Sequence, residues 1–163
     1  MQTRINITEP SFDGAEVEMV SAVLASKWVT QGPMTERFEA LIAANQRAAF
    51  AMACTSCTAG LHLATMALGL KPGDEVIVPA FTWVTSAHSV EYVGAKVVFV
   101  DIDLDNFNID PKALEAAVTP RTKAVIAVHL FGLAAPMDEI RAICSQRGIR
   151  IIEDAACAIA TTY

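Results

Sequence analysis

The sequence predicts an α/β fold of three layers, in which helices cover both faces of a mainly parallel sheet. Segments of strand character alternate with segments of helix character along most of the chain. Several expected strands, such as residues 75–80 and 123–130, are nearly continuous runs of Val, Ile and Ala. Alternation predicts strands joined by crossover helices, and strands that are apolar on both faces are typical of a sheet buried on both sides. At 163 residues, 53% of them apolar, the chain is long enough to bury one such core.

The N-terminal segment predicts two helices. Residues 11–28 carry apolar side chains at helical spacing, and Asp13 and Glu16 have the spacing of a capping box at the start. Residues 35–48 show the same periodicity, with Thr35 in the N-cap position.

The remaining elements follow in strict alternation. Strands are expected at residues 48–53, 75–80, 95–102, 123–130 and 149–155. Helices are expected at residues 58–68, 85–94, 110–118 and 137–148. Gly69 ends one helix, and Asp110 followed by Pro111 begins another. The sheet would therefore contain five strands.

The charge balance and the apolar pattern exclude two classes of partner. The net charge is −6, and no basic stripe is present that would neutralise a nucleic-acid backbone. Asp, Lys, Pro or Gly interrupt the longest apolar runs within about ten residues, so no membrane-spanning helix is expected. The first residues lack the basic and apolar regions of a secretory signal. We therefore expect a cytoplasmic protein.

Cys54 and Cys57 have the C-x-x-C spacing of some zinc and thiol-redox sites. A structural zinc ion needs four ligands, and no second C-x-x-C or paired histidine follows at a suitable distance. We therefore expect no metal site, and interpret the cysteines as small apolar residues in a reducing compartment.

Ligands of parallel sheets bind where strands end at their carboxyl edge, which draws attention to the loops after residues 53, 78 and 152. The first loop carries small hydroxylic residues, Ser56 and Thr58, before a helix start. Free backbone N–H groups, the helix dipole and hydroxyls suit a phosphate, although either hydroxyl could simply cap the helix. Neither glycine-rich nucleotide motif occurs in the chain, which weakens a dinucleotide or ATP interpretation.

The other two loops carry an aromatic pair and an acid. Phe81 and Trp83 follow the second of these strands, and a flat ring there can stack on a planar ligand or pack under the next helix. Asp154 follows the last strand, where its carboxylate can hold the proton of a ring nitrogen or cap a following helix. A phosphate anchor, a stacking face and an acid are together what pyridoxal phosphate requires.

With these features the chain resembles the DegT/DnrJ/EryC1/StrS group of sugar aminotransferases, which have the type I pyridoxal phosphate fold. The likeness covers nearly all of the chain, in the order and spacing of the family. It rests on "KWVTQGPMTERFE", "CTSCTAGLHLATMALGLKPGDEVIVPAFTWVTSAHSVEYVGAKVVFVDID", "NIDPKALEAAVTPRTKAVIAVHLFG" and "IIEDAACAI".

The resemblance implies a role for individual residues around pyridoxal 5'-phosphate or pyridoxamine 5'-phosphate. Ser56, Cys57 and Thr58 match the stretch that holds the cofactor phosphate. Trp83 matches the aromatic residue that stacks on the pyridine ring, and Asp154 the acid that pairs with the ring nitrogen.

The resemblance adds Cys157 to the cofactor-binding residues and also places residues outside this cofactor set. Cys157 matches the position near the phenolic oxygen of the ring, whereas for His129 we expect a structural role. Thr30, Gln31 and Gly32 match a loop near the substrate entrance.

The implied organisation is a partial cofactor-binding large domain over residues 1–163. Residues 1–34 would hold an N-terminal helix and the substrate-entrance loop, and residues 35–163 the α/β core. The small C-terminal domain of the family would be absent, and the large domain incomplete.

Three residues depart from the family pattern. Cys57 stands where glycine is usual and could loosen the tight backbone turn there. Gly60 stands where alanine is usual, at a cost of roughly 1 kcal/mol inside a helix. Ala160 stands where glycine is usual, which would be strained if the position required a positive φ. None of the three removes a group that the reaction needs.

The Schiff-base lysine of the family would lie beyond Tyr163, so no catalytic residue is expected within the chain. The five lysines stand in other contexts, at helix ends, in a turn and at strand starts. The resemblance therefore implies an N-terminal part of a longer protein, which would be inactive or poorly folded in isolation.

The complete enzyme would transfer an amino group from glutamate to a nucleotide-linked keto-sugar and would act as a homodimer. One alternative is a pyridoxamine phosphate-dependent sugar dehydratase of the same fold, in which histidine replaces the lysine. Another is a non-catalytic nucleotide-binding domain, against which the missing glycine-rich motif counts.

Overall fold

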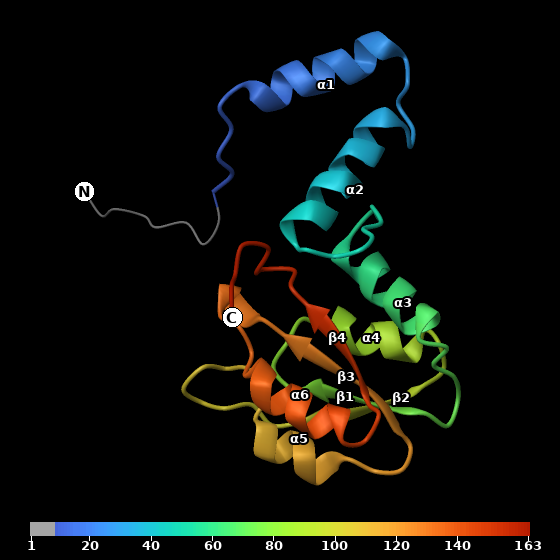
Figure 1. Cartoon of the computed structure of the whole chain (residues 1–163), viewed down its shortest axis with the longest axis vertical. Helices are drawn as coiled ribbons and strands as arrows, with labels where there is room; N and C mark the ends of the chain where they lie inside the picture. Colours follow the sequence, from blue (N-terminus) through green and yellow to red (C-terminus); the bar gives the residue numbers. More distant parts are fainter. Residues whose placement is uncertain (1–8) are drawn as a thin grey trace, which may run out of the picture. The chain divides into compact units, whose positions relative to one another are not determined.

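The computed structural model describes residues 9–163 and contains two compact units, one ending at Ala53 and the other spanning Cys54–Tyr163 (Figure 1). The N-terminal unit holds helices α1 (Ala15–Ser26) and α2 (Pro33–Asn45). The second unit holds the sheet and the remaining helices. The assignment of residues 1–34 to a helix and a substrate-entrance loop stays a prediction.

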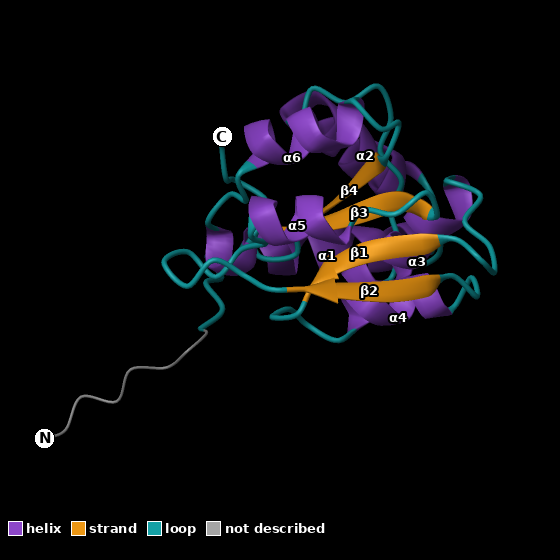
Figure 2. Cartoon of the chain, turned by 90° about the horizontal axis from the view of Figure 1, so that it is seen from below, coloured by secondary structure: helices purple, strands orange, loops and turns teal. Residues whose placement is uncertain are grey.

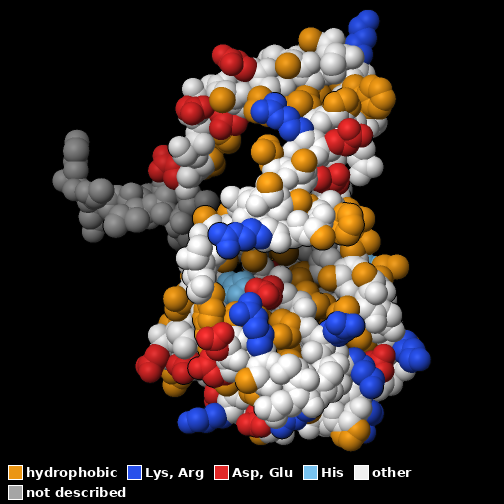
Figure 3. All heavy atoms as spheres, in the orientation of Figure 1, with side chains coloured by type: hydrophobic (Ala, Val, Ile, Leu, Met, Phe, Trp, Pro, Cys, Tyr) orange, Lys and Arg blue, Asp and Glu red, His pale blue; other side chains and the backbone are white. Residues whose placement is uncertain are grey.

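Helix α1 begins with the expected exchange of hydrogen bonds between its first residues. The Asp13 carboxylate accepts a bond from the N–H of Ala15 at 3.1 Å, and Glu16 Oε2 accepts one from the N–H of Asp13 at 3.3 Å. The predicted cap position was wrong by one residue, because the N-cap is Gly14 and Asp13 precedes it. No residue of α1 or α2 is buried, and Figure 3 shows hydrophobic side chains on the surface of both helices.

The expected N-cap of the second helix was wrong. Helix α2 starts at Pro33, with Gly32 as its N-cap, so Thr35 lies within the first turn. Proline is favoured at the first helical position because its φ is already helical and its missing N–H has no partner to lose there.

The strand expected at residues 48–53 was also wrong. Residues 51–54 form irregular backbone, and Phe50 and Met52 are 91% and 77% exposed. The N–H of Ala53 donates to Glu39 Oε1 at 2.8 Å instead of to a neighbouring strand. Apolar composition alone does not make a strand, because the backbone groups of a strand need a pairing partner.

Within residues 9–163 the sheet has four strands, all parallel, in the order β2-β1-β3-β4. The strands are β1 (Glu75–Pro79), β2 (Lys96–Val100), β3 (Thr122–Val128) and β4 (Arg150–Asp154). Their alternation with helices confirms the predicted parallel α/β class, with one strand fewer than expected.

Helices cover both faces of this sheet (Figure 2). They are α3 (Cys57–Ala67), α4 (Thr85–Glu91), α5 (Pro111–Ala117) and α6 (Met137–Ser145). Helices α3 and α4 lie on one face, and α5 and α6 on the other. The expected cap of α5 is confirmed, because the Asp110 carboxylate accepts a bond from the N–H of Lys112 at 2.9 Å.

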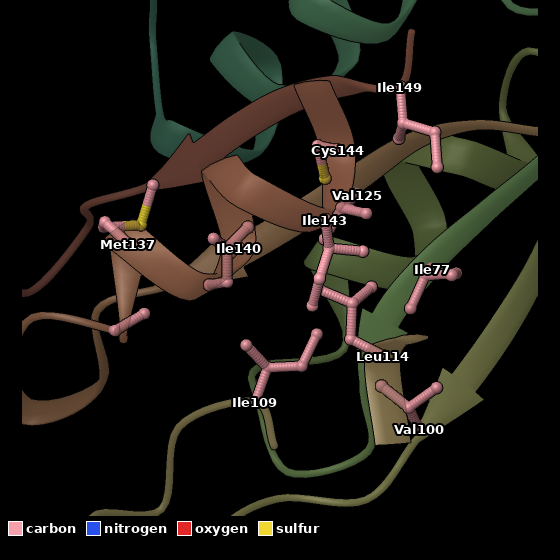
Figure 4. Close-up of a cluster of buried hydrophobic side chains, with 12 residues drawn as sticks. Ile77, Val100, Ile109, Leu114, Val125, Met137, Ile140, Ile143, Cys144 and Ile149 are labelled. Atoms are coloured by element: carbon pink, nitrogen blue, oxygen red, sulfur yellow. The ribbon is translucent and has the colours of Figure 1, made fainter. Parts of the chain in front are cut away.

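Two hydrophobic clusters fill the space between the sheet and its helices. Ile77 and Val125 point towards α5 and α6, where they meet Leu114, Ile140 and Ile143 (Figure 4). The opposite cluster contains Leu61, Val76, Val78, Val90, Ala124, Ile126 and Ile152. Successive strand residues alternate between the two clusters, because their side chains point to opposite faces. Each fully buried Ile, Leu or Val contributes about 1.5–3 kcal/mol to the stability of the fold. Both clusters therefore hold the strands and their ends in place.

A buried acid organises the amino edge of the sheet, opposite the edge where ligands bind. Glu75 is 2% exposed and accepts bonds from Thr119 Oγ1 at 2.6 Å and Arg121 Nη2 at 2.9 Å. Lys96 Nζ lies 3.3 Å from Glu75 Oε1. The hydrogen bonds from Thr119 and Arg121 lower the pKa of Glu75 to about 2, so the carboxylate is ionised at neutral pH.

No helix among the described residues has the length and apolar character needed to span a membrane.

Candidate functional site

The carboxyl edge of the sheet gathers polar groups around Asp154, the last residue of β4. Asp154 is 5% exposed. Ser86 Oγ, in the first turn of α4, donates to Asp154 Oδ2 at 2.9 Å. The other oxygen, Oδ1, accepts from the N–H of Ala156 at 3.2 Å and from the Cys57 thiol at 3.5 Å. Three separate segments therefore converge on one carboxylate.

All three donors to this carboxylate are neutral. The ion pairs found among residues 9–163 do not include Asp154. An ionised carboxylate has roughly four acceptor positions, so three donors leave capacity for one more, on Oδ2. Buried carboxylates are normally paired with a cation, and the described residues supply none to Asp154.

The start of α3 presents backbone donors beside the same edge. Ser56 is its N-cap, and Ser56 Oγ accepts a bond from the N–H of Ala59 at 3.2 Å, so the capping alternative holds for this hydroxyl. The first N–H groups of a helix, here those of Cys57 and Thr58, have no acceptor within the helix. Together with the positive end of the helix dipole they form a site suited to an anion.

Cys57 adopts backbone angles that do not require glycine. Helix α3 starts at this residue, and its φ is not positive. Loss of hydration at the contact, followed by the negative charge of Asp154, raises the pKa of Cys57 to about 11. The thiol is therefore protonated at neutral pH and acts as a donor. Ala160 is likewise free of the suspected strain, because its φ is not positive either.

The two aromatic residues after β1 differ in their surroundings. Trp83 is 76% exposed, so it does not pack under α4, and its ring is available to a ligand. Its carbonyl accepts a bond from the N–H of Ser86 at 3.0 Å, which ties it to the residue that contacts Asp154. Phe81 instead packs against Phe107, with ring centroids 5.9 Å apart.

Cys157 and His129 flank Asp154 without contacting its carboxylate. Cys157 is exposed in the turn that follows β4. His129 is 7% exposed, and its Nδ1 accepts a bond from the N–H of Ala135 at 3.0 Å. The proton must then lie on Nε2, which donates to Glu153 Oε2 at 3.0 Å. These contacts confirm the structural role expected for His129.

Thr30, Gln31 and Gly32 lie in the N-terminal unit, in the turn between α1 and α2. Trp28 Nε1 donates to the carbonyl of Gln31 at 2.7 Å, which closes this turn. A Cβ on Gly32 would overlap the indole of Trp28, which would have to move to accept another residue. The role of this loop in substrate entry stays a prediction.

Sequence reasoning missed Ser86, which is fully buried and makes the shortest contact to Asp154. Thr82 Oγ1 lies 3.0 Å from Ser86 Oγ and extends this network. The sequence feature that could have revealed this network is the presence of two hydroxyl residues, Thr82 and Ser86, shortly after the carboxyl end of β1. All four cysteines are free thiols, and no group of three His, Cys, Asp or Glu side chains in the described part of the chain could hold a metal ion.

The fold and this edge define an α/β domain of the type I aminotransferase class. The chain belongs to the DegT/DnrJ/EryC1/StrS aminotransferase family, whose model matches residues 10–163.

Solved structures agree with this membership. The chain is similar to an aminotransferase from Psychrobacter cryohalolentis, with 38% identity and a TM-score of 0.92 over 94% of this chain. It is similar to the PLP form of Spr1654 of Streptococcus pneumoniae, a protein described as a sugar aminotransferase. The identity is 32%, and the TM-score is 0.91 over 97% of this chain. It is also similar to a GDP-4-keto-6-deoxymannose-3-dehydratase with a trapped PLP-glutamate geminal diamine, with 34% identity and a TM-score of 0.88 over 93%.

The chain spans only part of these proteins. It covers 40%, 44% and 41% of the three solved chains.

Proposed function

We propose that this chain contributes the cofactor site of a pyridoxal phosphate-dependent enzyme that transfers an amino group from glutamate to a nucleotide-linked keto-sugar. The observation that carries the proposal is the buried Asp154 carboxylate, which is held by three neutral donors and has acceptor capacity left on Oδ2. A protonated ring nitrogen would supply the cationic partner that the described residues do not provide for this carboxylate.

The other residues at this edge fit the remaining parts of the cofactor. The backbone N–H groups of Cys57 and Thr58, at the start of α3, would bind the phosphate, with the hydroxyls of Ser56 and Thr58 beside them. The exposed ring of Trp83 would stack on the pyridine face.

When bound, pyridoxal phosphate supplies a conjugated ring that accepts electrons from the reacting carbon. The contribution of Asp154 is to hold a proton on the ring nitrogen, because an ionised carboxylate stabilises the protonated ring. Ser86 and Ala156 fix the orientation of that carboxylate. Cys157, in the turn after β4, would lie near the phenolic oxygen of the ring.

We place the lysine that bonds to the cofactor downstream of Tyr163, in a longer protein. Three of the four lysines of the second unit, Lys71, Lys96 and Lys123, stand at or just before the amino ends of strands, whereas Asp154 ends β4 at the carboxyl edge. The fourth, Lys112, lies in the first turn of α5. The similar solved chains are more than twice as long as the matched part. We expect this longer protein to be a homodimer. The four free thiols of the present chain suit the reducing cytoplasm.

A second candidate function is a sugar dehydratase that uses pyridoxamine phosphate. The similarity to the GDP-4-keto-6-deoxymannose-3-dehydratase supports it, at 34% identity. The two candidates share the cofactor site and differ in whether lysine or histidine acts beside it. The residue at that position in the complete protein decides between them.

Calorimetric titration with pyridoxamine 5'-phosphate tests the cofactor site itself. We expect wild-type protein to bind it and Asp154→Asn to bind at least about tenfold more weakly, because the amide cannot hold the ring proton. The matched control is Glu153→Gln, which removes the same charge one residue away, from a side chain that contacts His129. Equal affinity of wild type and Asp154→Asn, with both variants folded, contradicts the proposal.

A further inference from the structure

We propose that Cys57 is a positioning residue, whose thiol orients the Asp154 carboxylate by donating a hydrogen bond to it. The consequence for cofactor binding rests on the proposed function, whereas the contact itself does not.

The geometry assigns each oxygen of Asp154 a separate set of donors. Cys57 Sγ lies 3.5 Å from Oδ1, which also accepts from the N–H of Ala156 at 3.2 Å. Ser86 alone donates to Oδ2. With Oδ1 occupied twice, the remaining acceptor position is on Oδ2. The thiol therefore selects which oxygen stays available to a ligand.

Neither neighbouring cysteine makes this contact. The Cys54 thiol donates to the carbonyl of Ser56 at 3.1 Å. Cys157 lies in the exposed turn after β4. The raised pKa of Cys57 agrees with a donor role, because a thiolate could not donate to a carboxylate.

The position of Cys57 also joins two ends of the proposed site. Its backbone N–H is the first of α3, at the phosphate end, and its side chain reaches the carboxylate at the ring end. The contact bridges residues 97 positions apart in the chain. Glycine at this position would keep the backbone donor and lose the bridge, so this arrangement depends on the departure from the family pattern.

Infrared spectroscopy of the cofactor-free protein tests the hydrogen bond directly. The difference between wild type and Cys57→Ala isolates the S–H stretching band of Cys57. We expect this band at a lower wavenumber than that of a thiol in water, and a shift upwards in Asp154→Asn. A band at the position of a free thiol, unchanged in Asp154→Asn, overturns the proposal. If Asp154→Asn loses its fold, seen as alkylation of the buried Cys144, the wild-type band alone decides.

Alkylation rates give an independent readout from the same variants. At a mildly alkaline pH, iodoacetamide should modify Cys57 at least about threefold faster in Asp154→Asn than in wild type, because the thiolate is no longer opposed by a neighbouring carboxylate. Mass spectrometry resolves the cysteines, so Cys54 serves as the internal reference. Glu153→Gln should leave the Cys57 rate at its wild-type value. Equal rates in all three proteins count against the contact.

Cofactor affinity separates this inference from the proposed function. We expect Cys57→Ala to weaken binding of pyridoxamine 5'-phosphate about threefold and Cys57→Ser to restore it, because a hydroxyl can replace the donor. Equal affinities of the two variants contradict the positioning role. A lowered S–H band in a protein that binds no pyridoxamine 5'-phosphate contradicts the proposed function and leaves the contact established.

Discussion

At the scale of single residues, Asp154 and Glu75 show how position in the sheet decides what a buried acid does. Glu75 lies at the amino edge and is surrounded by Thr119, Arg121 and Lys96. Asp154 lies at the carboxyl edge and has only neutral donors among the described residues. The first acid is satisfied within the protein and stabilises the fold. The second retains capacity for a cationic ligand.

The lowered pKa of Glu75 predicts how stability depends on pH. Its pKa falls from 4.5 to about 2 on folding, so the ionised form stabilises the native state above pH 4.5. That stabilisation should decrease as the pH falls from 4.5 towards 2. Glu75→Gln should lower the urea midpoint at neutral pH and flatten its dependence on pH within this window.

Urea titrations from neutral pH to acid provide the measurement. The matched control is Glu139→Gln, on the exposed surface of α6, which should keep the wild-type pH dependence. A Glu75→Gln protein whose midpoint follows the wild-type curve throughout this range contradicts the role assigned to Glu75.

The residue-scale contacts of the site were only partly predictable. Asp154, Trp83 and Ser56 stand directly after or before elements that the sequence reveals, so their placement at one edge follows from the alternation of strands and helices. The contact of Ser86 with Asp154 joins positions 68 residues apart. Its existence depends on how α4 packs on the sheet, which hydroxyl spacing does not report.

At the scale of elements, local signals succeeded where a side chain caps its own helix. Asp110 caps α5 as predicted, because that bond joins residues only two positions apart. The strand at residues 48–53 failed because strand formation depends on a distant partner. The prediction that Thr35 is the N-cap of α2 was wrong because Pro33, two residues earlier, is the more favourable first residue of a helix.

Replacement of two helix-associated glycines by alanine should have opposite effects on stability. Gly60 lies inside α3, and an added Cβ would approach only Cys54 Sγ, at 3.4 Å. Gly60→Ala should therefore raise the free energy of unfolding by about 0.5–1 kcal/mol through helix propensity. Gly32→Ala should destabilise the N-terminal unit, because the new Cβ displaces the Trp28 indole.

Thermal unfolding followed by circular dichroism measures both variants. Loss of the bond between Trp28 Nε1 and the Gln31 carbonyl in Gly32→Ala should also appear as a shifted indole N–H resonance. A destabilised Gly60→Ala, or a Gly32→Ala protein with an unchanged indole resonance, contradicts this account.

At the scale of the whole molecule, the chain belongs to an aminotransferase family and spans about two fifths of the length of similar solved chains. The carboxyl edge of the parallel sheet carries Asp154 at the end of β4, and the start of α3 lies beside it. The proposed function assigns to this edge the binding of the cofactor and the retention of its ring proton.

The most direct test of the central claim is the protonation state of the bound ring. Pyridoxamine 5'-phosphate labelled with ¹⁵N in the ring should be titrated into wild-type protein and Asp154→Asn, and the ring resonance followed by NMR above the pH at which the free ring loses its proton. We predict a protonated nitrogen in wild type and a deprotonated one in Asp154→Asn, because the carboxylate holds the proton. A ring nitrogen that is deprotonated when bound to the wild-type protein would contradict the account.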